Sequence, residues 1–450
     1  MFRHTSEFHR WFSEQGRTHA YQVTPTPLDR LDGWDLDPDT GALRHQSGRF
    51  FSIDGLAVTT DHREVTSWAQ PIIDQPEVGI LGILVKRFDG VPHLLMQAKM
   101  EPGNRNLLQL SPTVQATRSN YTRVHQGNAV PYLAHFVAPR PGRVLFDALQ
   151  SEQGAWFLCK RNRNMIVEVE EDVPVLDGFC WLTLEQVGEL LGVENLVNMD
   201  SRTVLAGLPP MEPGLVPATA GTGSFREAVA GSSRPGARAM HDLTGLLSWF
   251  AEVKAARQLE RTRIPLSQAK GWIRSSERVS HESGRYFSVI GVNVKADSRE
   301  VGSWSQPMIA PSGRGVVAFL ARRVEGVLHL LVKAHTEAGT RDLAEIGPTL
   351  KCAPGNYEHL PAHRRPAFWD DVLCAPPERV RLDVVHSEEG GRFYHAENRY
   401  LVVEAAGDFP LEVPHDFTWM TVRQLMGMVR YSNHVNVEAR NLLADLRLMP

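Results

Sequence analysis

Side chains that can carry protons gather in two stretches of the chain. General acid–base catalysis uses Lys, Glu, Tyr and His when a pocket tunes their pKa values. The segment QAKMEPGN, which begins at Gln97, leaves a predicted strand and enters a Pro-Gly turn, where functional side chains often lie. An ordinary Glu-Pro-Gly turn is the alternative for Glu101. The candidate catalytic residues are Lys99, Glu101, Tyr121 and His125, opposite Lys333, His335, Glu337 and Tyr357 in the second stretch.

Two segments with the pattern Ser-Glu-x-Gly are candidates for anion binding. They read SEQGAWF from Ser151 and SEEGGRFYHAENRY from Ser387. Small Ser and Gly residues let backbone N–H groups approach a phosphate, and nearby arginines can bind a pyrophosphate through two hydrogen bonds each. A turn followed by a solvated, charged strand is the alternative. The candidate binding residues are Ser151, Glu152, Gln153, Gly154, Arg163, Ser387, Glu388, Glu389, Gly390, Arg392, Asn398 and Arg399.

Two tryptophans offer a platform for a nucleobase. Trp68 and Trp304 each stand three residues before a Pro in Trp-x-Gln-Pro, which indicates an extended segment. Stacking on a base is the functional interpretation, and a tryptophan in the core is the alternative.

Several motifs of other enzyme classes are missing from the sequence. It contains no P-loop, no GxGxxG after a predicted strand and no GxSxG nucleophile turn. It also contains no His-rich pattern with metal-ligand spacing. We therefore expect neither a required metal nor a bound cofactor.

The elements that must position these residues occur twice. SGRFFSI from Ser47 matches SGRYFSV from Ser283, and the same register aligns Trp68 with Trp304 and the two Ser-Glu-x-Gly segments. An offset that is two residues longer aligns Trp11-Phe12 with Trp249-Phe250. The chain is therefore a tandem duplication. We expect one domain at 1–208, a Pro-, Gly-, Ala- and Ser-rich linker at 209–241 and a second domain at 242–450. Within the linker, the stretch from Phe225 to Val229 is compatible with a short helical turn.

Each copy predicts the same succession of elements. An amphipathic helix carries the Trp-Phe pair, and an Asp89-Gly90 turn joins two strands in a hairpin that the second copy repeats at Glu325-Gly326. Thr183 and Thr421 are expected to cap helices. These signals predict an α+β fold in which a mixed β-sheet is flanked by helices.

Composition excludes several classes of protein. The formal net charge is −4 and no basic run is present, so we expect no nucleic-acid binding. The longest strongly apolar stretches, such as Gly79 to Val85, are too short to span a bilayer, and the first ten residues lack the apolar core of a signal peptide. We expect a cytoplasmic protein whose four cysteines are free thiols.

Four longer motifs resemble the nucleotide-diphospho-hexose 2,3-dehydratases. They are WAQPIIDQPEVGILGIL from Trp68, LLMQAKMEPGN from Leu94, LSPTVQATRSNYT from Leu110 and SEEGGRFYHAENRYLVVE from Ser387. The resemblance covers nearly the whole chain, including its duplication. It implies that each half is similar to a Nudix fold, and that the protein is a homodimer with paired nucleotide-sugar pockets, one of which can be vestigial.

The resemblance also implies a reaction. Such enzymes remove water across C2 and C3 of dTDP-4-keto-6-deoxy-glucose and give a 3,4-diketo-2,6-dideoxy sugar nucleotide. In antibiotic deoxysugar pathways a 3-ketoreductase or an aminotransferase then consumes this unstable product. On this interpretation thymine stacks on Trp68 or Trp304, and the diphosphate binds the Ser-Glu-x-Gly loops. The sequence leaves open which half is catalytic.

One feature of the wider Nudix superfamily is absent. Arg63-Glu64-Val65 and Arg299-Glu300-Val301 lack the two further glutamates of the magnesium-binding helix, so diphosphate hydrolysis is not expected. Two competing hypotheses are a nucleotide-sugar binding module without catalysis and a purely structural dimerisation protein.

Overall fold

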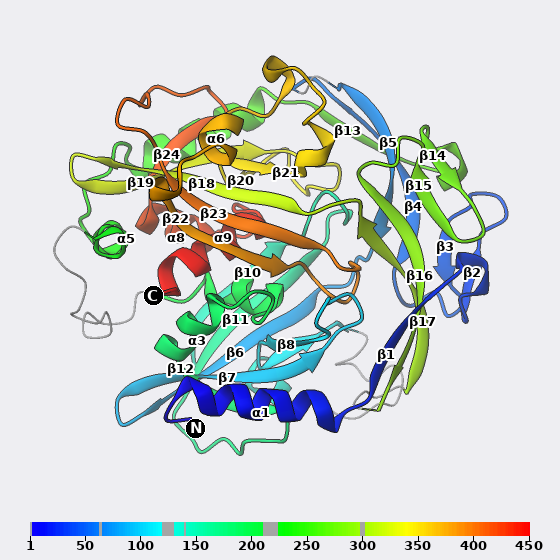
Figure 1. Ribbon diagram of the computed structural model, residues 1–450, viewed down its shortest axis with the longest axis horizontal. Coiled ribbons are helices and arrows are strands. Elements are labelled where there is room, and N and C mark those ends of the chain that lie inside the picture. Colours follow the sequence, from blue (N-terminus) through cyan, green and yellow to red (C-terminus); the bar gives the residue numbers. More distant parts are fainter. Residues whose placement is uncertain (1, 63–64, 119–129, 139–140, 210–223, 298–301) are drawn as a thin grey trace.

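The computed structural model describes residues 2–62, 65–118, 130–138, 141–209, 224–297 and 302–450 of the 450-residue chain (Figure 1). Both halves run through the same succession of elements. The first half contains α1 (Thr5–Thr18), β1 (Tyr21–Thr26), β2 (Trp34–Leu36), β3 (Leu43–His45), β4 (Ser52–Thr60), β5 (Ser67–Asp74), β6 (Gly79–Phe88), β7 (Val91–Met100), β8 (Leu108–Ser111), β9 (Val114–Ala116), β10 (Arg143–Ser151), β11 (Arg161–Val169), β12 (Phe179–Thr183), α3 (Leu184–Leu191) and α4 (Met199–Leu205).

The second half repeats this order with two additional α-helices among the described residues, α5 at its start and α7 before β22. It contains α5 (Phe225–Ser233), α6 (Leu243–Ala255), β13 (Leu259–Ile264), β14 (Trp272–Arg274), β15 (Arg278–His281), β16 (Phe287–Ala296), β17 (Ser303–Pro311), β18 (Gly315–Val324), β19 (Val327–His335), β20 (Glu345–Gly347), β21 (Leu350–Cys352), α7 (Trp369–Leu373), β22 (Val380–Ser387), β23 (Glu397–Glu404), β24 (Phe417–Thr421), α8 (Val422–Val429) and α9 (Val437–Leu448). The predicted mixed architecture of two similar halves is confirmed.

Local signals in the sequence account for several of these elements. The hairpin turn of β6 and β7 places Asp89 at φ 49° and Gly90 at φ 81°, and Glu325-Gly326 repeats this geometry at 49° and 83°. Short polar residues and glycine tolerate this left-handed conformation best. Thr183 caps α3 and Thr421 caps α8, each with a complete capping box. The hairpins and the caps were predicted, and the structure confirms both.

Each half contributes a seven-stranded sheet. In the first half its central order is β10-β11-β6-β7-β12, where β11 runs parallel to β6 and the other neighbours are antiparallel. The second half repeats this arrangement around β18 and β23. Apolar residues of α4 and α9 meet between the two sheets, and a single buried cluster contains side chains from both halves. The two sheets therefore share one core.

The two five-stranded sheets are built by strand exchange between the halves. Strand β1 of the first half pairs antiparallel with β16 of the second, and β13 of the second half pairs with β4 of the first. These sheets lie together on one side of the molecule, to the right in Figure 1. Each half therefore supplies the edge strand of the other half's sheet.

Part of the segment expected to be a linker is a structured helix. Ser224 caps α5, and Ser232 Oγ donates to the Leu328 carbonyl at 2.6 Å and accepts from the Val422 N–H at 2.9 Å. Residues 225–233 therefore pack against the second half.

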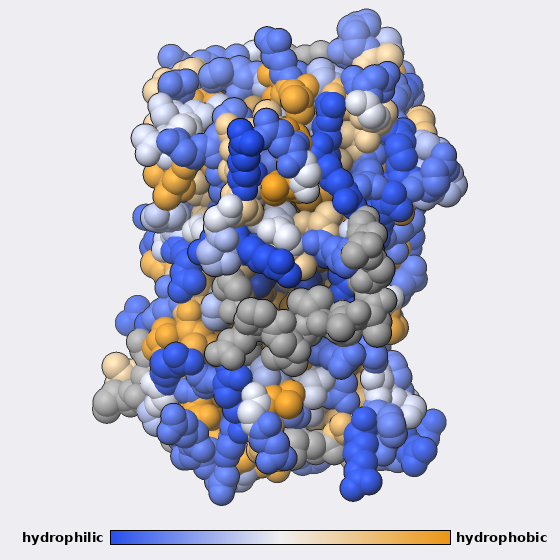
Figure 2. Space-filling view, turned by 90° about the vertical axis from the view of Figure 1, so that its left-hand side faces the viewer, coloured by the Kyte–Doolittle hydropathy of each residue, from blue (hydrophilic) through white to orange (hydrophobic). Residues whose placement is uncertain are grey.

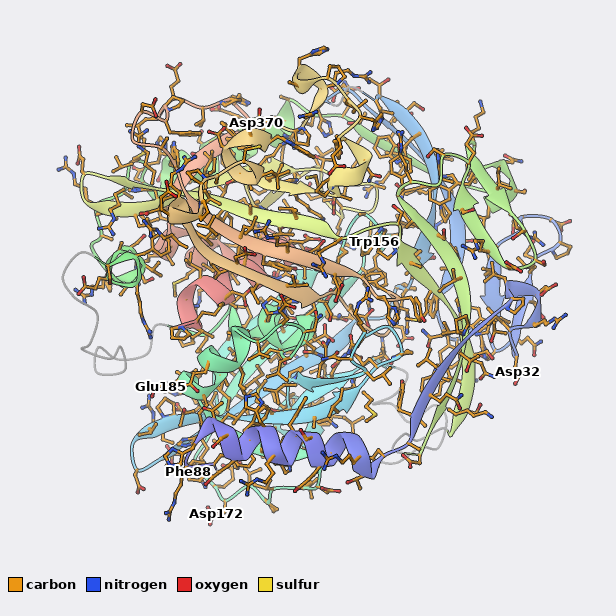
Figure 3. All side chains as sticks on the ribbon, in the orientation of Figure 1. Asp32, Phe88, Trp156, Asp172, Glu185 and Asp370 are labelled. Carbon is orange, nitrogen blue, oxygen red and sulfur yellow. The ribbon has the colours of Figure 1, made fainter. Side chains whose placement is uncertain are left out.

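Charged side chains cover the outside of the molecule. Asp32, Asp172, Glu185 and Asp370 point outward, whereas Trp156 lies at the junction between the two kinds of sheet (Figure 3). On the face in Figure 2, apolar residues are scattered among hydrophilic ones. None of the helices within the described ranges is long and apolar enough to cross a membrane.

Candidate active sites at the junction of the two halves

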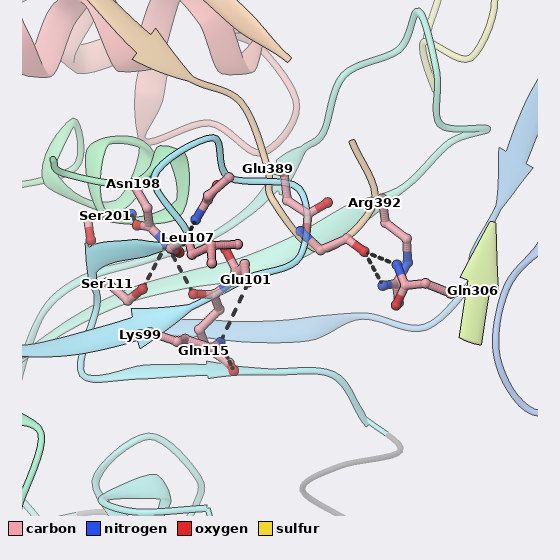
Figure 4. Close-up of polar contacts among 12 residues, drawn as sticks. Lys99, Glu101, Leu107, Ser111, Gln115, Asn198, Ser201, Gln306, Glu389 and Arg392 are labelled. Atoms are coloured by element: carbon pink, nitrogen blue, oxygen red, sulfur yellow. Dashed lines mark hydrogen bonds and ion pairs between the residues drawn. The ribbon is translucent and has the colours of Figure 1, made fainter. Parts of the chain in front are cut away.

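A buried polar cluster lies where β7 and β9 meet the start of α4. We call it the first cluster, and its members are Lys99, Glu101, Gln115, Asn198 and Asp200. Gln115 Nε2 donates to Glu101 Oε1 at 2.8 Å, and Lys99 Nζ lies 3.9 Å from the same oxygen. Lys99 Nζ also donates to the Gln115 carbonyl at 3.3 Å, and Asn198 Nδ2 donates to Gln115 Oε1 at 3.2 Å (Figure 4). The amide of Gln115 therefore holds Glu101 in place.

The secondary structure fixes these side chains. Lys99 lies one residue before the end of β7, and Glu101 follows in the turn. Asn198 is the N-cap of α4, where its Oδ1 accepts from the Ser201 N–H at 2.8 Å and leaves its amide group for Gln115. A helix cap thus also positions a residue of the cluster.

The first cluster holds two buried carboxyl groups. Glu101 is 5% exposed and Asp200 4%. Burial raises the pKa of Asp200 well above its usual range, and the neighbouring Glu152 and Glu101 carboxylates raise it further. A carboxyl group that can donate a proton therefore lies close to Lys99 and Glu101, the combination that general acid–base chemistry requires.

A loop from the other half covers the first cluster. The Gly103 N–H donates to the Gly390 carbonyl at 2.7 Å. A Cβ at Gly103 would lie 1.8 Å from the Phe393 carbonyl oxygen, so only glycine permits this approach. Arg202, fully buried in α4, donates to the Ser387 carbonyl at 2.7 Å, and Gln109 Nε2 donates to Ser387 Oγ at 2.6 Å. The loop that carries the candidate residues Ser387, Glu388, Glu389 and Gly390 thus packs on the turn that carries Glu101.

The Trp-x-Gln-Pro segment of the second half supports the same loop. Gln306 Nε2 donates to the Gly391 carbonyl at 2.6 Å and its Oε1 accepts from Trp304 Nε1 at 2.9 Å. The Arg392 guanidinium lies 4.3 Å from the centre of the Phe51 ring, and its Nε donates to Gln75 Oε1 at 3.2 Å. Gln306 therefore links Trp304 to the loop that covers the first cluster, and Arg392 lies in that loop.

The duplication produces a second cluster with different chemistry. Lys351 replaces Gln115 and His335 replaces Lys99, while Glu337 and Glu438 correspond to Glu101 and Asp200. Lys351 Nζ lies 2.6 Å from one carboxylate oxygen of Glu337 and 2.6 Å from one of Glu438. Burial alone would lower the pKa of Lys351, but these two carboxylates raise it instead. In the second cluster, a buried ammonium group therefore pairs with both carboxylates.

The loop of the first half covers the second cluster in the same way. The Gly339 N–H donates to the Gly154 carbonyl at 2.6 Å, and Arg440 Nη2 donates to the Ser151 carbonyl at 2.6 Å. Gln70, two residues after Trp68, donates through its Nε2 to the Ala155 carbonyl at 2.8 Å. The second cluster therefore has the loop with Ser151 and Gly154, and the segment with Trp68, beside it.

The two covering loops meet each other between the clusters. Gln153 Nε2 donates to Glu388 Oε2 at 2.7 Å. Asn398 and Tyr400 donate to Glu388 Oε1, at 2.6 Å and 2.7 Å. Asn162 makes the equivalent bond to Glu152, at 2.7 Å. Glu388 therefore joins the two loops, and both glutamates are buried.

An arginine-rich cavity of about 380 Å³ adjoins the second cluster. Four arginines line it, and one of them, Arg263, pairs with Asp74 at 2.7 Å. Trp68 packs against the small apolar cluster that contains Leu56, and Leu56 also lines this cavity. The arginines are Arg161, Arg261, Arg263 and Arg341. Such a concentration of guanidinium groups suits a diphosphate.

The remaining candidate residues lie elsewhere. Arg163 pairs with Asp147 at 2.6 Å and Arg399 with Asp383 at 2.5 Å, each toward the neighbouring outer strand. Arg163 also lines a smaller cavity beside the arginine-rich one. Lys333 Nζ lies 5.2 Å from the Phe417 ring centre. Tyr121 and His125 are outside the described residues.

Sequence reasoning missed several residues of the site. Gln115, Asp200, Lys351 and Glu438 lie on elements outside the QAKMEPGN and Ser-Glu-x-Gly segments. Among the described residues, no group of three or more His, Cys, Asp or Glu side chains has a geometry that could hold a metal ion.

Comparison with known proteins gives the family. A model of the family described as NDP-hexose 2,3-dehydratase matches residues 5–208 and again residues 243–446. The chain is 57% identical over 451 residues to a dTDP-4-dehydro-6-deoxy-alpha-D-glucopyranose 2,3-dehydratase of Streptomyces violaceoruber, covering 99% of this chain and 98% of that one. Proteins with the same name from Saccharopolyspora spinosa and Amycolatopsis orientalis are 51% and 47% identical, each over 98% of this chain and over 91% and 89% of their own lengths. The chain therefore belongs to the NDP-hexose 2,3-dehydratase family.

Proposed function

We propose that this protein is a hydro-lyase that removes water across C2 and C3 of dTDP-4-keto-6-deoxy-glucose. The product is the 3,4-diketo-2,6-dideoxy sugar nucleotide of deoxysugar biosynthesis. Relatives matched along nearly their whole length carry the name of this activity. The observation that carries the proposal is the first cluster, which places an ammonium group beside buried carboxyl groups, one of which, Asp200, has a raised pKa.

The chemistry of the substrate assigns roles to these groups. The C4 ketone makes the C3 hydrogen acidic, so a carboxylate can remove it. Glu101, held by Gln115, is the described residue best placed to act as this base. The Lys99 ammonium, 3.9 Å from Glu101, stabilises the charge that develops on the C4 oxygen. Tyr121 and His125 stay in the candidate acid–base set on the sequence argument.

We place catalysis in the pocket of the first cluster rather than the second. In the second cluster Lys351 lies between Glu337 and Glu438, so neither carboxylate is available as a base without breaking a buried ion pair. A neutral amide occupies this position in the first cluster. The arginine-rich cavity beside the second cluster then serves to bind a nucleotide without turnover.

The decisive experiment combines the substrate with a 3-ketoreductase, NADPH and EDTA, followed by mass spectrometry. A dTDP sugar that has lost the C2 oxygen and been reduced at C3 supports the proposal. Glu101→Gln should abolish this product, whereas the matched Glu337→Gln should preserve it. Binding of the substrate without conversion, with the reductase shown to be active, would instead indicate a nucleotide-sugar binding module.

Some finer features belong to the same proposal. We expect a cytoplasmic homodimer that passes its product to a 3-ketoreductase or an aminotransferase, and a Nudix-like fold in each half. The mixed sheet with parallel β6 and β11, and the four free cysteines, are compatible with these expectations. Light scattering of the purified protein tests the dimer directly.

A further inference from the structure

The loop of the second half brings one more carboxyl group to the first cluster. The backbone of Gly103 binds that of Gly390, and a Cβ at Gly390 would lie 3.0 Å from the Cβ of Glu101. Glu389, which directly precedes Gly390, is half-buried, and its Oε1 accepts from the Gly391 N–H at 3.0 Å. Its Oε2 is shielded from solvent and has no hydrogen-bond partner among the described residues. One carboxyl oxygen of Glu389 is thus held by a backbone hydrogen bond, and the other is left to interact with a substrate.

The surroundings of Glu389 favour its protonated form. Burial raises its pKa to about 7, with Glu101 adding to the effect and Arg392 opposing it. Glu152 also faces this group, and its own Oε2 is buried and lacks a partner in the part of the chain that the structure describes. Carboxyl groups held together in this way share protons, so Glu389 can deliver one at neutral pH.

The equivalent position in the other loop carries an amide. The two loops match as Ser-Glu-x-Gly, but Gln153 stands where the second loop has Glu389. The Gln153 amide donates to Glu388 at 2.7 Å and cannot supply an acidic proton. The second cluster, which contains Lys351, therefore lacks a carboxyl group at this position of its covering loop.

We propose that Glu389, supplied by the second half, is the general acid that protonates the departing C2 hydroxyl group in the pocket of the first cluster. This role rests on the proposed 2,3-dehydration. After Glu101 has taken the C3 proton, the enolate re-forms the C4 carbonyl, the C2–C3 double bond forms and the C2–O bond breaks. The oxygen takes the proton of Glu389 and leaves as water. The C3 enol then takes up a proton at C2 and becomes the 3-ketone.

The test separates proton removal from loss of the leaving group. Glu389→Gln is assayed with the natural substrate and with its 2-deoxy-2-fluoro analogue, because fluoride departs with far less need of a proton. We expect turnover of the natural substrate to fall about 100- to 1000-fold. Fluoride release should fall less than about tenfold, and exchange of the C3 hydrogen with deuterium oxide should persist. Glu389→Asp, which retains a carboxyl group, should recover part of the activity.

Other outcomes would overturn the assignment. Equal loss of dehydration, fluoride release and C3 exchange would show that Glu389 acts earlier than leaving-group departure or only supports the fold. Turnover within about threefold of the wild type would exclude a role as general acid. The exposed Glu412→Gln substitution is the matched control and should behave as the wild type. Failure of the wild-type protein itself to dehydrate the natural substrate would instead reject the proposed function.

Discussion

Exchanging the residues that distinguish the two clusters tests which pocket is catalytic. Gln115→Lys would place an ammonium group beside Glu101 and Asp200, as Lys351 lies beside Glu337 and Glu438 at 2.6 Å. The reciprocal Lys351→Gln change gives the second cluster the neutral amide of the first. Each variant copies a side chain that the protein already accommodates at the equivalent position.

The size of the effect follows from the electrostatics of a buried carboxylate. A cation within hydrogen-bonding distance lowers the pKa of a neighbouring carboxyl group by about 1–3 units. At 1.36 kcal/mol per unit, the base loses about 1.4–4 kcal/mol of proton affinity. Gln115→Lys also removes the amide that holds Glu101. A positioned general base contributes about 100- to 10,000-fold to a rate, so we expect at least a 100-fold loss of kcat/KM.

The assay is formation of the reduced 2-deoxy sugar nucleotide with a coupled reductase. Lys351→Gln should keep turnover within about threefold of the wild type. It should lower thermal stability, because Glu337 and Glu438 lose their buried partner. Equal activity of Gln115→Lys and wild type, or loss of activity only in Lys351→Gln, would refute our choice of pocket.

Three further perturbations follow from the structure. Burial raises the pKa of Glu345 from 4.5 to about 8, so the folded state loses stability as pH rises from 4.5 through 8. Glu345→Gln should therefore stabilise the protein by about a few kcal/mol at pH 9, seen as a higher melting temperature, and give no gain at pH 5. Arg161→Glu copies Glu397, the equivalent residue in the other half. Titration calorimetry of this variant should find one dTDP site per chain instead of two, and its turnover should be unchanged. Two intact sites would exclude the arginine-rich cavity as a nucleotide site. Arg202→Ala removes the hydrogen bond to the Ser387 carbonyl, and urea unfolding should show a loss of about 2–3 kcal/mol in the free energy of unfolding. Steady-state kinetics should show a raised KM, and an unchanged KM would exclude support of the loop by Arg202.

Local features of the fold were predictable because their causes are local. An Asp-Gly pair specifies the hairpin of β6 and β7 through its left-handed turn, and Thr183 specifies the start of α3 through its capping box. The duplication was visible because both copies keep these signals in one register. The exchange of β1 and β13 was not predictable, since alternation along a strand does not indicate which sheet the strand joins.

The candidate site was predictable only in part, for a similar reason. Lys99 and Glu101 belong to a recognisable segment, but Gln115 and Asp200 contact them from elements placed by tertiary packing. One signal was present in the register of the repeats, which aligns Arg202 with Arg440. An arginine repeated beside apolar residues in both copies points to a buried partner, and the structure shows that partner to be a loop of the other half.

The exchange of strands and loops makes each half depend on the other, whichever cluster carries out the chemistry. The pocket of the first cluster takes its covering loop, Trp304 and Gln306 from the second half, and β1 of the first half completes the sheet that carries this Trp-x-Gln-Pro segment. The two halves also share one hydrophobic core through α4 and α9. The ion pairs of Lys351 with Glu337 and Glu438 in the second cluster leave these supporting contacts intact. Loss of the second half would remove Glu389 and expose that core, so both halves are needed even if, as we propose, catalysis takes place only at the first cluster.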